Sequence, residues 1–159
     1  MKSAYTTLAQ VVILSLWLGA ALCVVAIVAP AAFAALPSRA LAGALVGRVL
    51  PALFYAGIVA GVAVAMLEWG GNARSPVTVR GSSGFVVAVS CAIAQFVIAP
   101  RIEGVRVRIG GAVDSLPPDD ALRVAFGRLH GLSVLWLGVA AIAAILALVS
   151  SFRASRLPA

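Results

Sequence analysis

The side chains that could do chemistry in this chain gather around its only histidine. His130 lies in the segment Arg128-Leu-His-Gly-Leu-Ser133, so the Ser133 hydroxyl follows it by about one helical turn. An imidazole in apolar surroundings can transfer protons or bind a metal ion. The alternative is an interfacial imidazole bonded to a carbonyl or a lipid phosphate, and the position of His130 near the start of an apolar segment favours this alternative.

Two cysteines complete the set of candidate metal ligands. Cys23 and Cys91 each lie near the middle of an apolar segment and lack the C-x-x-C spacing of a redox motif. With His130 they are weak candidates for a metal site, because zinc usually takes about four N, S or O ligands. A copper(I) site is chemically allowed, since sulfur ligands select that ion. Cysteines in such apolar segments more commonly serve as small buried hydrophobic residues.

The sequence predicts neither an enzyme nor a bound cofactor. A haem with two histidine ligands cannot form in a monomer that has one histidine. The chain has no P-loop, G-x-S-x-G, H-E-x-x-H or paired-carboxylate motif. We therefore expect no catalytic residue.

The composition indicates what kind of protein must position these side chains. Of the 159 residues, 63% are hydrophobic and 11% are charged, and the mean hydropathy is +1.12. Soluble proteins have about 25% charged residues. This composition excludes a disordered chain, a disulfide scaffold and an ordinary soluble enzyme, and it predicts an integral membrane protein.

Four windows without Lys, Arg, Asp or Glu are long enough to cross a bilayer, which takes about 20 residues of helix. None alternates apolar and polar residues as barrel strands do. We predict an all-α, four-helix transmembrane bundle that forms one domain over 1–159, with helices at about 7–35, 39–69, 82–108 and 119–151. The first apolar run is too long for a cleaved signal peptide, so we expect it to be retained. The windows lie between Lys2 and Arg39, Arg48 and Glu68, Arg80 and Arg101, and Arg128 and Arg153.

Two short matches predict that the helices form two tandem hairpins. Val28-Ala29-Pro30 and Ile98-Ala99-Pro100 end the first and third helices. Gly47-Arg48-Val49 and Gly127-Arg128-Leu129 open the second and fourth, and the wider separation of this second pair indicates a longer connection in the second hairpin. Such parallel repeats occur in some transporters. The alternative is a chance match between short motifs of common residues.

Four spans place the polar ends of both hairpins on one side of the membrane. The candidate polar site there comprises His130, Arg128, Ser133, Arg101 and Glu103. That side has seven Lys and Arg residues against five on the other, which favours a cytoplasmic polar end with both termini in the periplasm. Eleven arginines against one lysine favour a bacterial source, hence the inner membrane.

Other polar and small residues indicate how the helices pack. Glu68 lies beside Trp69, and we interpret it as an interfacial anchor rather than a proton or cation site. Gln95 is expected to find a partner on another helix. Two G-x-x-x-G pairs predict close helix packing. These pairs are Gly57 with Gly61 and Gly127 with Gly131.

The net charge of +7 predicts attraction to anionic lipid headgroups. Nucleic acid is not an expected partner, because the basic residues are divided between both ends without a stacking aromatic platform. We expect the lipid bilayer as a partner, and a homo-oligomer or a larger membrane complex as a further assembly.

An ordered set of motifs over nearly the whole chain resembles the family of domain of unknown function 4149, which is similar to eukaryotic transmembrane protein 205. The motifs are Trp17-Leu18-Gly19, Val28-Ala29-Pro30 with Phe33, Ala99-Pro100-Arg101-Ile102, and Phe126-Gly-Arg-Leu-His130-Gly-Leu-Ser133. The chain departs from the family pattern at Leu137, where an Asn is frequent. This departure weakens any polar-site argument for the fourth helix.

The resemblance implies a small four-helix membrane protein without an assigned reaction. Association of the eukaryotic relatives with platinum-drug resistance implies handling of soft metals, and the Trp-Leu-Gly motif also resembles membrane domains of copper-resistance proteins. We expect a role in transport or soft-metal tolerance. The alternatives are a haem- or quinone-binding membrane subunit and a structural accessory subunit.

Overall fold

The computed structural model describes residues 2–70 and 78–154 and is 92% helical. Four helical spans are long and apolar enough to cross a membrane, which confirms the predicted all-α transmembrane bundle. The first span consists of α1 (Lys2–Cys23), the π-helix η1 (Val24–Val28) and α2 (Ala29–Ala35). The second is α3 (Arg39–Gly70), and the fourth is α6 (Ala121–Ala154). The third consists of α4 (Val79–Ala92), the π-helix η2 (Ile93–Ile98) and α5 (Ala99–Ile109), and the 3₁₀ turn η3 (Val113–Ser115) follows it.

The helix ends follow from local capping. Thr78 Oγ1 accepts a hydrogen bond from the Gly81 amide, so α4 begins at Val79 rather than at the predicted position 82. Asp120 Oδ1 accepts from the amide of Leu122, and α6 therefore begins at Ala121 rather than at 119. Gly110 ends α5 in a left-handed conformation that glycine adopts without strain.

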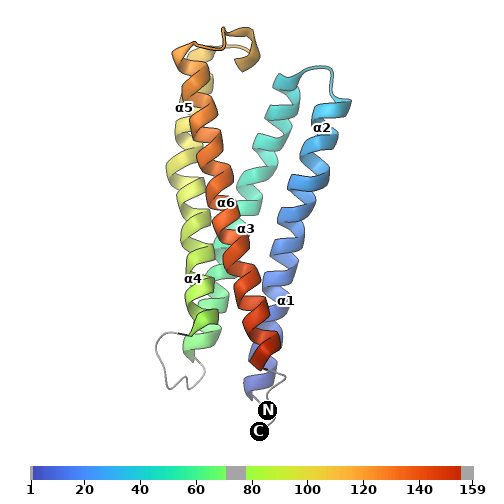
Figure 1. The fold of residues 1–159 in the computed structure, drawn as a ribbon, viewed down its shortest axis with the longest axis vertical. Coiled ribbons are helices and arrows are strands. Elements are labelled where there is room, and N and C mark those ends of the chain that lie inside the picture. The colour runs from blue at the N-terminus through green and yellow to red at the C-terminus, as the bar shows by residue number, and fades with distance from the viewer. Residues whose placement is uncertain (1, 71–77, 155–159) are drawn as a thin grey trace.

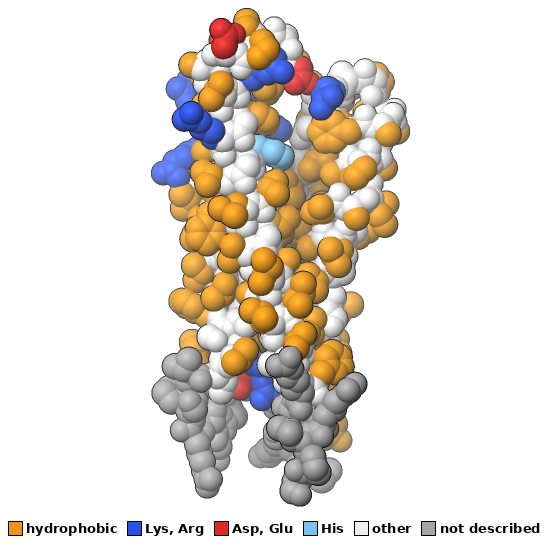
Figure 2. Space-filling model, in the orientation of Figure 1, with side chains coloured by type: hydrophobic (Ala, Val, Ile, Leu, Met, Phe, Trp, Pro, Cys, Tyr) orange, Lys and Arg blue, Asp and Glu red, His pale blue; other side chains and the backbone are white. Residues whose placement is uncertain are grey.

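The helices form a ring in which α1 packs on α3, α3 on α4, α4 on α6, and α6 on α1. The beginning of α1 and the end of α6 lie at the same end of the bundle, which we call the terminal end (Figure 1). At the opposite end, the α2–α3 hairpin diverges from the α5–α6 hairpin (Figure 1). We call this the arginine end, because arginine side chains gather there above a band of hydrophobic side chains (Figure 2).

Glycines bring α3 and α4 into close contact. A Cβ atom on Gly61 would lie 2.5 Å from the Gly84 carbonyl oxygen, and one on Gly57 would lie 2.5 Å from Cys91 Sγ. Gly57 and Gly61 thus allow the close approach that their spacing predicts, with Gly84 as a partner on α4. A Cβ atom on Gly127 or Gly131 would have no neighbouring atom within 4 Å. The packing predicted for that second pair is not found among the described residues.

Trp17 fills the centre of the bundle next to this glycine contact. Its indole Nε1 donates a hydrogen bond to the Leu53 carbonyl over 3.1 Å, so its polar group is satisfied although the side chain is buried. A Cβ atom on Gly57 would lie 2.7 Å from that nitrogen. The absence of a side chain on Gly57 thus makes room for Trp17 as well as for α4.

Both π-helices end two positions before a proline. The segment η1 ends at Val28 before Pro30, and η2 ends at Ile98 before Pro100. Proline has no amide hydrogen and its ring clashes with the carbonyl of residue i−4, and a π-helical turn accommodates this local break. Val28 and Ile98 are also the first residues of the two matching tripeptides in the predicted repeat. The similarity between the two hairpins thus extends from the sequence to the backbone.

Candidate functional site

A network of polar side chains lies inside the bundle at the terminal end. Glu68 in the last turn of α3 accepts a hydrogen bond from Gln10 Nε2 of α1, with 2.9 Å between Nε2 and Oε2. Arg80 in the first turn of α4 approaches the same oxygen, with 3.6 Å between Nε and Oε2. The Glu68 side chain is 10% exposed and that of Arg80 is 25% exposed. One carboxylate therefore connects three of the four spans.

Gln10 is the most deeply buried member of this network. It lies on the same face of α1 as Leu14 and Trp17, because positions 10, 14 and 17 follow the helical spacing of an inward face. Its Nε2 also donates to the Val64 carbonyl over 3.3 Å. Its Oε1 is buried and has no hydrogen-bond partner in the described part of the chain. One buried acceptor of the network is thus unsatisfied.

Arg80 closes the network by reaching α1 as well as α3. Its guanidinium NH1 donates to Thr7 Oγ1 of α1 over 3.2 Å. Gly81 lets Glu68 come close, because a Cβ on Gly81 would lie 3.3 Å from Glu68 Cγ. Trp69 is exposed, whereas the Glu68 carboxylate turns into the bundle, so the two side chains do not share one outward face.

Sequence reasoning missed Gln10 and Arg80 as site residues. Gln10 lies in the first window, which is an uncharged apolar run, and Arg80 is a charged residue that flanks the third window. A signal was present for Gln10, since it is the polar residue in the inward stripe that continues through Leu14, Trp17 and Ala21. No comparable pattern marked Arg80, because its role depends on how α4 packs against α1 and α3.

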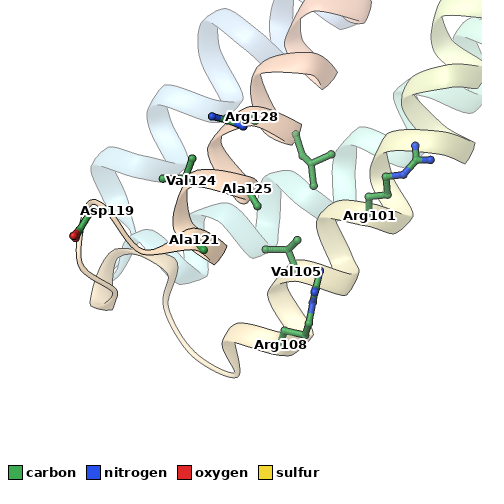
Figure 3. Close-up of a pocket in the computed structure, with 9 residues that line it drawn as sticks. Arg101, Val105, Arg108, Asp119, Ala121, Val124, Ala125 and Arg128 are labelled. Atoms are coloured by element: carbon green, nitrogen blue, oxygen red, sulfur yellow. The ribbon is translucent and has the colours of Figure 1, made fainter.

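A second candidate site is a groove of about 660 Å³ between α5 and α6 at the arginine end. Arg101 and Arg108 of α5 and Arg128 of α6 line it, and Asp119 lies at its rim (Figure 3). Among the residues that the structure describes, no carboxylate oxygen lies within 4.0 Å of these three guanidinium groups. The other lining residues are apolar. They are Val105, Ala121, Val124, Ala125 and Leu129.

The structure divides the polar site that the sequence predicted. Arg101 and Arg128 line the same groove, as expected from their shared side of the membrane. His130 is exposed and does not line it, while Ser133 is buried and thus lies on another face of α6. Glu103 is exposed and also lies outside the lining. The predicted proximity of the five residues is therefore only partly correct.

His130 instead belongs to a stack with Phe126 and Arg106. The rings of His130 and Phe126 are parallel within 3°, with 6.2 Å between their centroids. The Arg106 guanidinium carbon lies 5.5 Å from the Phe126 ring centroid, a distance typical of a cation–π contact. The His130 imidazole thus lies beside the Phe126 ring, which also contacts the Arg106 guanidinium of α5.

Arg106 was not among the predicted site residues, and it bridges the two hairpins. It is half-buried and its NH2 donates to the Gly43 carbonyl of α3 over 3.3 Å. Gly47 lies beside the same guanidinium, because a Cβ there would be 3.1 Å from NH1. Pro51 has no amide hydrogen to donate to the Gly47 carbonyl, so this turn of α3 lacks one backbone hydrogen bond near Arg106.

The candidate metal ligands do not come together. Cys23 is exposed on the outer surface of the first span, and Cys91 is buried against Gly57. No group of three or more His, Cys, Asp or Glu side chains that could hold a metal ion occurs within residues 2–70 and 78–154. Gln95 Oε1 is buried without a partner in the described residues, so the interhelical bond expected for that oxygen is not found.

A known protein family matches more than half of this chain. The family described as Domain of unknown function (DUF4149) matches residues 12–110, which include most of the first span and all of the second and third. The segment around His130 lies beyond the matched range. No curated protein and no solved structure matches the chain.

Proposed function

The chain belongs to the DUF4149 family. We propose that this member of the family is a non-enzymatic transport protein of the cell membrane in which Glu68 binds and releases a proton. The observation that supports this proposal is the Glu68 network of Gln10, Arg80 and Thr7 inside an apolar bundle. Ionisable side chains within membrane-spanning helices are costly, and they often belong to ion or proton pathways.

The neighbours of Glu68 disfavour a metal cation at this position. Arg80 already neutralises the carboxylate, so a second cation next to Glu68 would be repelled by the guanidinium group. A proton binds to the carboxylate itself and removes its charge. That change weakens the contact with Arg80 and alters the connection between α3 and α4.

The unsatisfied Gln10 Oε1 supports the same proposal. A buried acceptor without a donor costs free energy, and it would be satisfied by a water molecule or by a protonated group. This oxygen belongs to the amide that already binds Glu68, so a donor placed there would lie next to the carboxylate. A buried acceptor next to the Glu68 carboxylate is a suitable position for a proton-donating group in a proton-transport protein.

Proton flux into vesicles tests the proposal. The purified chain is reconstituted into vesicles that contain a pH-sensitive dye, and an acidic external buffer is applied with valinomycin and potassium to balance the charge. We expect faster acidification than in protein-free vesicles, and Glu68→Gln should abolish the difference. Glu103→Gln is the matched control, because Glu103 is an exposed carboxylate outside both sites. Equal rates in wild-type and protein-free vesicles would contradict the proposal.

Soft-metal tolerance and a haem or quinone subunit receive no comparable support. The candidate ligands Cys23, Cys91 and His130 do not gather among the described residues. The resemblance to transmembrane protein 205 has no counterpart among the curated proteins compared. The cytoplasmic placement of the arginine end and the periplasmic termini remain predictions from the charge distribution. The bacterial inner membrane remains a prediction from the excess of arginine over lysine.

A further inference from the structure

The groove between α5 and α6 is separate from the Glu68 network, because no residue of that network lines it. We propose that this groove binds the headgroup of an anionic phospholipid. Its lining combines three arginines with one aspartate, so the formal charge around it is positive. The proposal goes beyond the proposed transport function and does not depend on it.

The three arginines have hydrogen-bond donors to spare. Arg101 NH1 donates to the Val97 carbonyl over 3.0 Å, and Arg108 Nε donates to the Gly104 carbonyl over 3.3 Å. Both acceptors are carbonyls of the third span itself. A guanidinium group has five N–H donors in a planar arrangement that matches a phosphate group. The free donors and the absence of carboxylate partners in the described residues make this groove suited to an anion.

The apolar lining favours a lipid over free phosphate. Val105 is buried at the base of the groove, and Val124 and Leu129 form part of its wall. The volume of about 660 Å³ is in the range of sites that hold small organic molecules, and it far exceeds what one phosphate ion needs. A phospholipid supplies both the phosphate for the arginines and apolar groups for the valines and leucine.

The position of the groove also matches a lipid headgroup. It lies where the span Val79–Ile109 ends and the span Ala121–Phe152 begins. The large apolar side chains of Val97 and Leu132, farther along the same two spans, are exposed on the outer surface. A headgroup bound at the arginines would thus place its acyl chains beside helices that already face lipid.

Lipid titration of the purified full chain tests this inference. In a mild detergent, native mass spectrometry measures binding of phosphatidylglycerol and of phosphatidylcholine. We expect tighter binding of phosphatidylglycerol, and each of Arg101→Gln and Arg128→Gln should weaken it about fivefold. Arg48→Gln is the matched control, because Arg48 is an exposed arginine on α3 that does not line the groove. Its affinity for phosphatidylglycerol should equal that of the wild-type protein.

Two outcomes of the titration would overturn the inference. Equal losses in Arg48→Gln and Arg128→Gln would mean that general surface charge, rather than the groove, attracts the lipid. Displacement of phosphatidylglycerol by an equal concentration of inorganic phosphate would identify the ligand as a free anion.

Photo-crosslinking of the wild-type chain keeps the inference testable if the arginine variants do not fold. A photoactivatable phosphatidylglycerol should label peptides that contain residues 101–108 and 119–129. Labelling confined to other segments would contradict the inference. Glu68→Gln should leave this labelling unchanged, so a failure of the proton proposal is distinguishable from a failure of this one.

Discussion

Glu68 and Arg80 form an ion pair within the helical bundle, with 3.6 Å between Oε2 and Nε, and this pair connects the end of α3 to the beginning of α4. The two helices are consecutive in the chain, since α3 ends at Gly70 and α4 begins at Val79. Gln10 then attaches α1 to the same carboxylate. This end of the bundle is therefore held by polar contacts as well as by apolar packing.

The ion pair predicts a specific pattern of stability in a double-mutant cycle. Glu68→Gln removes the charge that neutralises Arg80, and we expect the free energy of unfolding to fall by about 2 kcal/mol. This loss is smaller than for a fully buried ion pair, because Arg80 is partly exposed. Glu68→Gln with Arg80→Gln should recover part of the loss, with a coupling energy of about 1 kcal/mol. Denaturant titration in detergent micelles measures both. Additive effects would mean that the two side chains do not interact.

The close contact between α3 and α4 predicts that Gly61 cannot carry a side chain. A Cβ atom there would lie 2.5 Å from the Gly84 carbonyl oxygen and 2.6 Å from the Ala88 amide nitrogen, and both atoms belong to the backbone. We expect Gly61→Ala to lower the free energy of unfolding by about 2 kcal/mol, through helix displacement. Gly131→Ala is the control, because a Cβ atom on Gly131 would have no neighbour within 4 Å. It should be neutral or stabilise the helix by up to about 1 kcal/mol. Equal effects at the two glycines would refute the close packing.

The number and approximate limits of the helices could be predicted from the sequence because uncharged windows and caps are local features. Helix number depends on the length of apolar segments, and the end of α5 depends on Gly110. Helix α6 begins at Ala121 rather than at the predicted position 119, because Asp120 caps it. Arg123 follows Asp120 by three residues, and its NH1 donates to the Leu116 carbonyl over 2.6 Å.

Which residues make up the two sites could be predicted only in part, because the sequence gives only a weak signal for how the helices pack. Membrane topology correctly placed Arg101 and Arg128 at one end, and their position on adjacent helices brought them to one groove. Topology does not give the rotation of a helix about its axis, and the inward face of α6 proved to contain Ser133 but not His130. The Glu68 network was missed for the same reason, since the interior direction of its side chain is set by packing among α1, α3 and α4.

The hydrogen bond from the Trp17 indole to the Leu53 carbonyl predicts that loss of this donor lowers the free energy of unfolding. Trp17→Phe keeps most of the apolar volume but loses the donor, and it leaves a small void beside Gly57. We expect the free energy of unfolding to fall by about 2 kcal/mol, from the lost bond and the void together. Trp69→Phe, at an exposed position, should change stability little. Thermal unfolding of both variants in the same detergent measures the difference, and equal melting temperatures would contradict the bond.

The contacts of Arg106 are expected to limit how far the two hairpins separate at the arginine end. Its bond to Gly43 and its contact with the Phe126 ring connect α5 with α3 and α6. Arg106→Met keeps an unbranched apolar side chain but removes both polar contacts. We expect a broader and longer distance distribution between spin labels at Ala40 and Gly111, measured by pulsed electron paramagnetic resonance.

Arg108→Met is the matched control for this experiment, because the Arg108 guanidinium bonds to a carbonyl of its own helix. It should leave the distance distribution as it is in the wild-type protein. If Arg106→Met also leaves the distribution unchanged, then the hairpins are held together by other contacts, such as the exposed Arg39–Asp114 ion pair, whose Nε and Oδ2 atoms are 3.1 Å apart.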